Sequence, residues 1–168
     1  MTIEVPCELS PGTATVTVNG PGGSKSINVQ IQSAAPGIFE TVGSDRRLRG
    51  VVIRPDGSFA TRENPVRRGE TAHMLVTGIG PVIPSIGTNQ VGLPESDSVG
   101  NPDNLIVGID NSGIQVIRAT NARNLVGVYE VSFVVPADAR TGDSIPLAFA
   151  VVVNGNLVFG NGSLIAIQ

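Results

Sequence analysis

Few side chains in this 168-residue sequence could carry out catalysis. Nucleophilic catalysis needs a nucleophile, a general base and a group that orients the base. The sequence has one cysteine, Cys7, and one histidine, His73, and nothing in the segments around them indicates that they meet. Because His73 alternates with the apolar residues Ala72 and Met74, we expect it on the solvent-facing side of a strand. We therefore predict no catalytic residues and no enzymatic activity; in particular, a hydrolase would lack the residues it needs.

An acidic segment holds the candidate metal ligands. Carboxylates suit Ca²⁺, and Glu95, Asp97 and Asp103 are the candidates. The run 95–100 resembles the start of an EF-hand loop only loosely, because the twelfth position is Ile106 and not a glutamate. One cysteine and one histidine are too few for an ordinary zinc site. We therefore expect a solvated loop here, with no bound metal and no cofactor.

Of two arginine clusters in the sequence, the first is a candidate for contacting anions. Asp45, Arg46, Arg47 and Arg49 fall in a segment that we expect to be a loop, and guanidinium groups there could bind carboxylates or phosphates. The second cluster, at 67–70, combines charges with a glycine just before an apolar strand, as a turn that starts a strand would. We expect a structural role for both clusters and keep the first as candidate ligand contacts.

Sugar binding has little support in the composition. Aromatic rings usually form the platform for a sugar, and this sequence has no Trp and one Tyr. Tyr129 lies in an apolar segment, so we expect a core residue. The tripeptide 161–163 fits a glycosylation sequon, but we expect it to be only a turn.

The elements that would position these side chains are short strands joined by tight turns. Twenty-one Gly and twelve Pro separate runs rich in Val and Ile, and no window keeps helical spacing for three turns. Hydrophobic residues make up 40% of the chain and charged residues 15%, which favours a folded core over disorder. We predict an all-β fold, namely an Ig-like antiparallel β-sandwich with an extra N-terminal β-hairpin. The expected strands include a hairpin at 13–32, a hairpin around 55–57, and segments 71–77, 105–109, 114–119 (after a turn at 111–113), 126–135, 145–153 and 157–167.

An internal repeat organises the chain into two parts. The pattern Val-Pro-x-x-Leu/Ala-x-x-Gly, followed by a strand and Val-Asn-Gly, occurs at 5–20 and again at 135–155. The second copy closes a domain that starts near residue 34. We therefore predict a complete Ig-like sandwich at 34–168, and at 1–33 the C-terminal hairpin of a truncated preceding Ig-like domain, docked or exchanged. The alternative is that the two copies share only common strand–turn chemistry. We expect a part of a longer protein, with Met1 as an added start residue.

Six phrases, taken in order, resemble an uncharacterised C-terminal domain family of large exported proteins from Acidobacteria, notably Solibacter. They are Val5-Pro6-x-Glu8-Leu9, AAPGIF at 34–39, NPVRRGE at 64–70, TGIGPV at 77–82, GVYEV at 127–131, and Val135-Pro136 with Thr141-Gly142-Asp143. The resemblance covers nearly the whole chain and implies a sandwich similar to Ig-like or IPT/TIG modules. It carries over no catalytic residues. The sequence departs from the family's pattern at Cys7, where an aromatic is common, and in the acidity of 85–104.

Two functions from different classes follow. The first is a non-catalytic extracellular structural, adhesion or protein-interaction module at the C-terminus of a larger exported bacterial protein. Its partners would be other domains of the parent chain or cell-surface proteins, or a second copy in a homodimer formed through the N-terminal hairpin. The alternative is a ligand-binding module for a glycan or Ca²⁺ that uses end loops 40–50 and 85–104. A net charge of −3 gives no basic surface for nucleic acid, and no apolar run of about 18 residues is present for membrane insertion.

Overall fold

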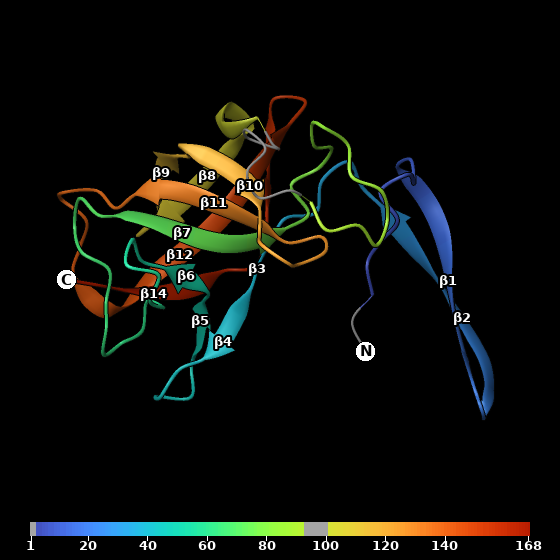
Figure 1. Ribbon diagram of the computed structural model, residues 1–168, viewed down its shortest axis with the longest axis horizontal. Coiled ribbons are helices and arrows are strands. Elements are labelled where there is room, and N and C mark those ends of the chain that lie inside the picture. The colour runs from blue at the N-terminus through green and yellow to red at the C-terminus, as the bar shows by residue number, and fades with distance from the viewer. Residues whose placement is uncertain (1–2, 93–100) are drawn as a thin grey trace.

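Antiparallel strands make up the chain, as Figure 1 shows. The computed structural model describes residues 3–92 and 101–168. Within these ranges the one helical segment is a short 3-10 turn, η1 (Pro102–Asn104). The prediction of an all-β fold is therefore confirmed.

The first sheet is built around a central strand with strictly alternating burial. Along β7, Ala72, Met74 and Val76 are fully buried and the residues between them are half-buried. A strand alternates in this way when one of its faces covers a core. The strand order is β10-β11-β7-β3, with β6 also paired to β7; the bounds are β3 (Gly37–Ile38), β6 (Val52–Ile53), β7 (Thr71–Thr77), β10 (Arg118–Asn121) and β11 (Tyr129–Val134).

The second sheet is built around the longest strand, β12 (Gly142–Val153). This strand pairs with β8 on one side, and on the other with β13 near its end and β14 near its start. The strand order is β13-β12-β8-β9, with β14 also paired to β12; the other bounds are β8 (Leu105–Ile109), β9 (Ser112–Gln115), β13 (Asn156–Phe159) and β14 (Ser163–Ile167). A separate pair of strands, β4 (Glu40–Val42) and β5 (Leu48–Gly50), flanks the sheets.

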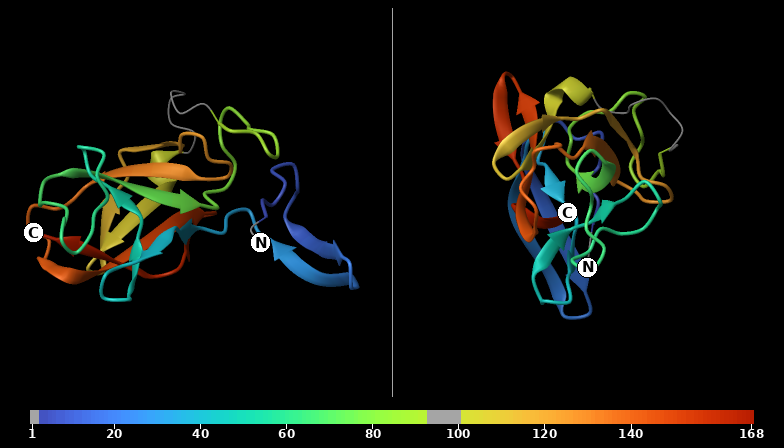
Figure 2. Two further views of the ribbon diagram at one scale, coloured as in Figure 1. Left: turned by 60° about the horizontal axis from the view of Figure 1, so that its bottom comes forward. Right: turned by 90° about the vertical axis from the view of Figure 1, so that its left-hand side faces the viewer.

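The two sheets form a β-sandwich around one hydrophobic core. Met74 and Phe133 of the first sheet and Val107 and Phe149 of the second are at most 1% exposed and belong to the same apolar cluster. Burying side chains of this size contributes roughly 1.5–3 kcal/mol each. Figure 2 shows the two layers edge-on. The core cluster contains none of residues 3–33.

Two segments expected as single strands are each divided in the structure. The segment 114–119 ends its first pairing at Gln115 in β9 and begins a new one at Arg118 in β10, so the chain crosses from one sheet to the other. The segment 157–167 is divided into β13 and β14, which pair with different parts of β12. Between them a Cβ on Gly160 would lie 2.7 Å from the Pro36 carbonyl oxygen, so the chain passes another backbone there at close range.

The first two strands form a hairpin outside the sandwich. β1 (Gly12–Gly20) pairs with β2 (Gly23–Ile31) along its whole length, and the turn is Pro21-Gly22. Figures 1 and 2 show this hairpin projecting from the end of the sandwich opposite the C-terminus. The segment that follows the hairpin is fixed to the sandwich by the Ala35 N–H, which donates to the Gly78 carbonyl at 2.9 Å.

Candidate functional site

One face of the β1–β2 hairpin is entirely polar. Four pairs of opposite side chains hydrogen-bond across the two strands on this face, so that each hydroxyl or amide has a partner on the neighbouring strand. The pairs are Thr13–Gln30 at 3.2 Å, Thr15–Asn28 at 2.9 Å, Thr17–Ser26 at 2.8 Å and Asn19–Ser24 at 2.5 Å. A ladder of this kind holds the register of the hairpin and suits a face that water covers.

The other face of the hairpin, which we call the hairpin face, is apolar except for Lys25, which lies opposite Val18 near the turn. Because side chains alternate along a strand, the residues between those of the ladder point the other way. Val16 lies opposite Ile27 and Ala14 lies opposite Val29. Ile27 is 56% exposed. The hairpin is therefore amphipathic, and its apolar side lies outside the core of the sandwich.

The segment before the hairpin contacts a loop that follows β7. Glu4 accepts a hydrogen bond from the Asn89 N–H at 2.6 Å, and Glu8 accepts from the Thr88 N–H at 3.2 Å and from the Thr88 hydroxyl at 2.5 Å. The Cys7 N–H donates to the Thr88 hydroxyl at 3.1 Å. These bonds place the N-terminal segment against the sandwich. The hydrogen bonds from the Thr88 hydroxyl and N–H lower the pKa of Glu8.

The structure keeps the two candidate catalytic side chains apart. The Cys7 thiol contacts Glu4 at 3.9 Å, whereas His73 lies on β7 and contacts residues of β11. Burial raises the pKa of the Cys7 thiol, and the charges of Glu4 and Glu8 raise it further. A thiol of this kind is a poor nucleophile near neutral pH.

A Ser–His–Glu cluster that the sequence does not predict lies on the outer face of the first sheet. His73 Nδ1 lies 2.9 Å from the Ser132 hydroxyl and 3.3 Å from a carboxylate oxygen of Glu130. A catalytic triad needs the serine and the carboxylate on different ring nitrogens, because the base must pass a proton while the acid orients it. Here both contact the same nitrogen, so the cluster stabilises the pairing of β7 with β11. Predicting this cluster requires the register that puts Ser132 of β11 opposite His73 of β7, which the sequence alone does not define.

The candidate ligand contacts at 45–49 bond mainly within the protein. Arg49 is 4% exposed, forms an ion pair with Asp45 at 2.7 Å and donates to the Asp143 carbonyl. This pair lowers the pKa of Asp45. Arg47 donates to the Ser144 hydroxyl at 3.2 Å, and Arg46 is exposed on the loop with a φ of 62°. The cluster therefore holds the β4–β5 loop against the start of β12.

The candidate calcium ligands do not come together in the part of the chain that the structure describes. Glu95 and Asp97 lie outside the described residues. Asp103 lies in η1, where a carboxylate oxygen accepts from the Gln115 amide at 3.1 Å. Across 3–92 and 101–168, no group of three His, Cys, Asp or Glu side chains could hold a metal ion. The described part of loop 85–104 contacts Glu4 and Glu8, while loop 40–50 contacts Asp143 and Ser144.

Tyr129, the turn at 67–70 and Asn161, which the sequence analysis also considered, contribute to packing and hydrogen bonding within the sandwich. Tyr129 is 9% exposed at the start of β11, and burial raises the pKa of its hydroxyl. In the turn before β7, Arg67 donates its N–H to Glu70 at 2.8 Å, and Gly69 adopts a φ of 75°. Asn161 joins the two sheets, because its side chain accepts from the Ile38 N–H at 2.7 Å and donates to the Ile38 carbonyl at 3.2 Å.

Comparison with known proteins gives no relative to set beside this geometry: no family model, curated protein or solved structure matches the chain. The resemblance to the Acidobacteria family stays a prediction. None of the helices among the described residues has the length and apolar character needed to span a bilayer.

Proposed function

We propose that this chain is a non-catalytic, immunoglobulin-like structural and protein-interaction module of an exported bacterial protein, and that its interaction surface is the hairpin face. One observation carries the proposal. The hairpin has a polar face whose side chains bond to each other and an apolar face that leaves Ile27 and Val18 about half-exposed. Water does not favour an exposed apolar face of this kind, and contiguous exposed patches mark interaction sites.

The charged clusters support this assignment over ligand binding by the end loops. Arg49 and Asp45 bond to each other, and Arg47 bonds to Ser144. Guanidinium groups engaged in this way have fewer donors left for an anion. The contacts of His73 also support a structural role, because Ser132 and Glu130 both contact the same ring nitrogen.

Site-specific photo-crosslinking in the cells that produce the protein tests the proposal. A photoreactive amino acid replaces Val16 or Ile27 on the hairpin face, and in matched variants it replaces Thr15 or Asn28 on the polar face of the same two strands. We expect crosslinks to a protein segment, identified by mass spectrometry, from the first two positions and none from the second two. Crosslinks from neither face, or equally from both, would contradict an interaction through the hairpin face.

A further inference from the structure

The two copies of the sequence repeat form the same turn. In the first copy the Leu9 N–H donates to the Pro6 carbonyl at 3.2 Å, and in the second the Ala139 N–H donates to the Pro136 carbonyl at 3.1 Å. Each turn leads, three residues later, to the first residue of a long strand. The shared sequence pattern is therefore also a shared local structure.

The strands that follow begin with the same backbone conformation. Gly12 opens β1 with a φ of 149°, and Gly142 opens β12 with a φ of 152°. Both values lie in a region that L-residues with a side chain rarely adopt. Each strand then turns back on an antiparallel partner, β2 in the first copy and β13 with β14 in the second. The hairpin β1–β2 is thus the counterpart of the strands that close the sandwich.

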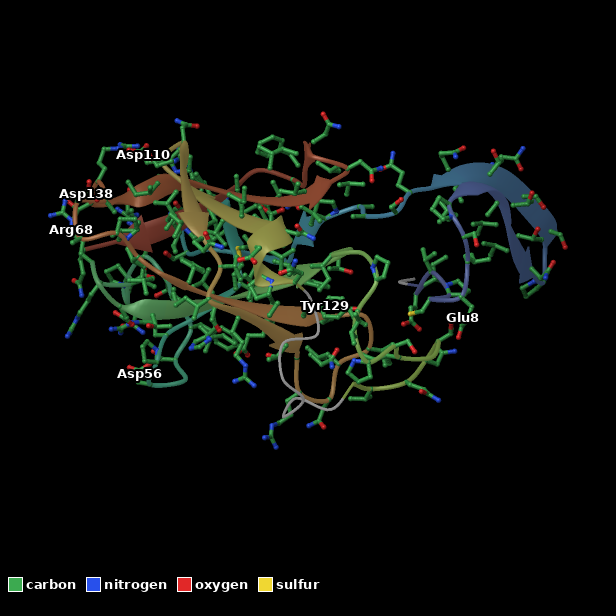
Figure 3. All side chains as sticks on the ribbon, turned by 90° about the horizontal axis from the view of Figure 1, so that it is seen from above. Glu8, Asp56, Arg68, Asp110, Tyr129 and Asp138 are labelled. Carbon is green, nitrogen blue, oxygen red and sulfur yellow. The ribbon has the colours of Figure 1, made fainter. Side chains whose placement is uncertain are left out.

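In the second copy we call residues 34–134 the opening half of the sandwich and residues 135–168 its closing half. A turn of the opening half, just before β7, covers residues 135–139. The Val135 N–H donates to the Glu70 carbonyl at 2.9 Å, and the Val135 carbonyl accepts from the Gly69 N–H at 2.8 Å. The Arg68 guanidinium donates to the Ala139 carbonyl at 2.6 Å. Val135 is fully buried and Ala139 is 9% exposed. Figure 3 shows Arg68 at this end of the molecule, far from Glu8 and the hairpin.

In the first copy the counterparts of these residues are exposed in the described chain. Val5, the counterpart of Val135, is 53% exposed, and Leu9, the counterpart of Ala139, is 46% exposed. When the two copies are aligned on their Val-Asn-Gly turns, with Val18 on Val153, the hairpin face corresponds to the side of β12 on which Phe149 and Val151 are buried. In this alignment β12 has five more residues than β1 between its opening glycine and the turn. The hairpin therefore presents the surface of a closing half without an opening half against it in the residues that the structure describes.

We infer that the β1–β2 hairpin closes a second sandwich, whose opening sheet precedes it in the same polypeptide. That sheet would lay an apolar strand, like β7, over Val16 and Ile27. It would begin with an Arg-Gly turn whose arginine donates to the Leu9 carbonyl and whose backbone pairs with Val5. The partner would precede the hairpin by analogy with β11, which ends directly before Val135; Ile3 and Glu4, directly before Val5, form no strand in this structure. This inference rests on the proposed function, because it names the partner of the hairpin face.

A tandem chain tests the inference. Residues 34–134 are placed directly before Val5 of the protein, so that the hairpin follows an opening half in the register of the second copy. We expect amide hydrogen exchange in β1 and β2 to slow by about 100-fold relative to the original chain, because backbone amides exchange slowly when the unit that holds them is stable. The substitution Arg68→Ala in the added segment alone should reduce the protection near Leu9.

Paired substitutions supply the controls. Val16→Asp with Ile27→Lys alters one opposite pair on the hairpin face, and Thr15→Asp with Asn28→Lys alters the neighbouring pair on the polar face. Only the first should abolish the added protection. A second tandem, with residues 34–168 in front, shows whether the added opening half folds when its own closing half is supplied.

Unchanged exchange in β1 and β2, in a tandem whose control folds, would overturn the inference. If face-specific crosslinks persist in that case, the proposed function stands and the partner is a different protein. If the crosslinks are also absent, both proposals fail.

Discussion

At the scale of single residues, most of the contacts that the sequence does not predict involve buried charges or a close approach of two backbone segments. The alternation of His73 with Ala72 and Met74 correctly predicts that the histidine lies on the outer side of its strand, since these two neighbours are buried. It could not place Glu130 beside it, because that contact depends on the register between two strands more than fifty residues apart in the sequence. The same limit hid the bond from Arg49 to the Asp143 carbonyl.

Gly78 is the glycine whose replacement should cost the most. Its φ is 67°, and a Cβ there would lie 1.9 Å from the Ala35 carbonyl oxygen, so Gly78→Ala meets both backbone strain and a collision. We expect a loss of about 3 kcal/mol or more in the free energy of unfolding, measured by urea denaturation. Gly57→Ala is the matched control, because Gly57 has a φ of 80° and open space around it; about 1 kcal/mol is expected there. Equal losses for the two variants would contradict the close approach of residues 35 and 78.

Glu130 should make stability depend on acidity. The hydrogen bond with His73 lowers the pKa of Glu130, so the folded state binds the proton of this group less readily than the unfolded chain. Its contribution to stability is then complete above the ordinary pKa of a glutamate and is lost as the pH falls through the lowered value. The free energy of unfolding should fall more steeply between about pH 5 and pH 3 in the original protein than in Glu130→Gln. Identical slopes would show that the His73–Glu130 contact contributes nothing.

At the scale of elements, the strand type was predictable and the division of strands was not. Apolar residues at every second position predict both strands without any tertiary information: Ala72, Met74 and Val76 in β7, and the odd-numbered residues 145–151 in β12. The break between β13 and β14 depends on where the chain must pass Pro36, and the crossing between β9 and β10 depends on which sheet has room for each. Contacts of this kind are set by packing between segments far apart in the sequence.

Asn161 should be important for the junction of the two sheets. Its amide bonds to both the N–H and the carbonyl of Ile38, which is 6% exposed, so Asn161→Ala leaves buried backbone groups without these partners. We expect a loss of roughly 1–3 kcal/mol in the free energy of unfolding, measured by urea denaturation. Asn156→Ala removes a bond to the Asn154 carbonyl on an exposed strand and should change the value by less than about 0.5 kcal/mol. A neutral Asn161→Ala would mean that water replaces its amide.

At the scale of the whole molecule, the hairpin lies outside the hydrophobic core of the sandwich. The apolar cluster of the sandwich starts at Ala34, and the hairpin contributes nothing to it. The repeat in the sequence predicts a closing hairpin of a separate domain at 1–33, and this division into domains stays a prediction. The position of the hairpin relative to the sandwich could not be predicted from the sequence. It depends on hydrogen bonds from the segment before β1 (Glu4, Cys7 and Glu8) to residues 88–89, which are about 80 residues away in the sequence.

Removing residues 1–33 should leave the sandwich intact. Because none of residues 3–33, the part of this segment that the structure describes, packs in its core, the chain 34–168 should unfold within about 3 °C of the original midpoint, a shift that corresponds to roughly 1 kcal/mol for a domain of this size. Differential scanning calorimetry measures the midpoint. Loss of a cooperative transition in the shortened chain would show that the hairpin is part of the folding unit.

The central claim is that the hairpin face is an interaction surface carried beside a sandwich that is stable without it. Amide hydrogen exchange of the unaltered chain, followed by mass spectrometry at a concentration where sedimentation shows a monomer, tests this claim most directly. We predict that amides of β7, β11 and β12 exchange only with global unfolding, and that those of β1 and β2 exchange at least about 100-fold faster. Equal protection of the hairpin and the sandwich in the monomer would contradict it.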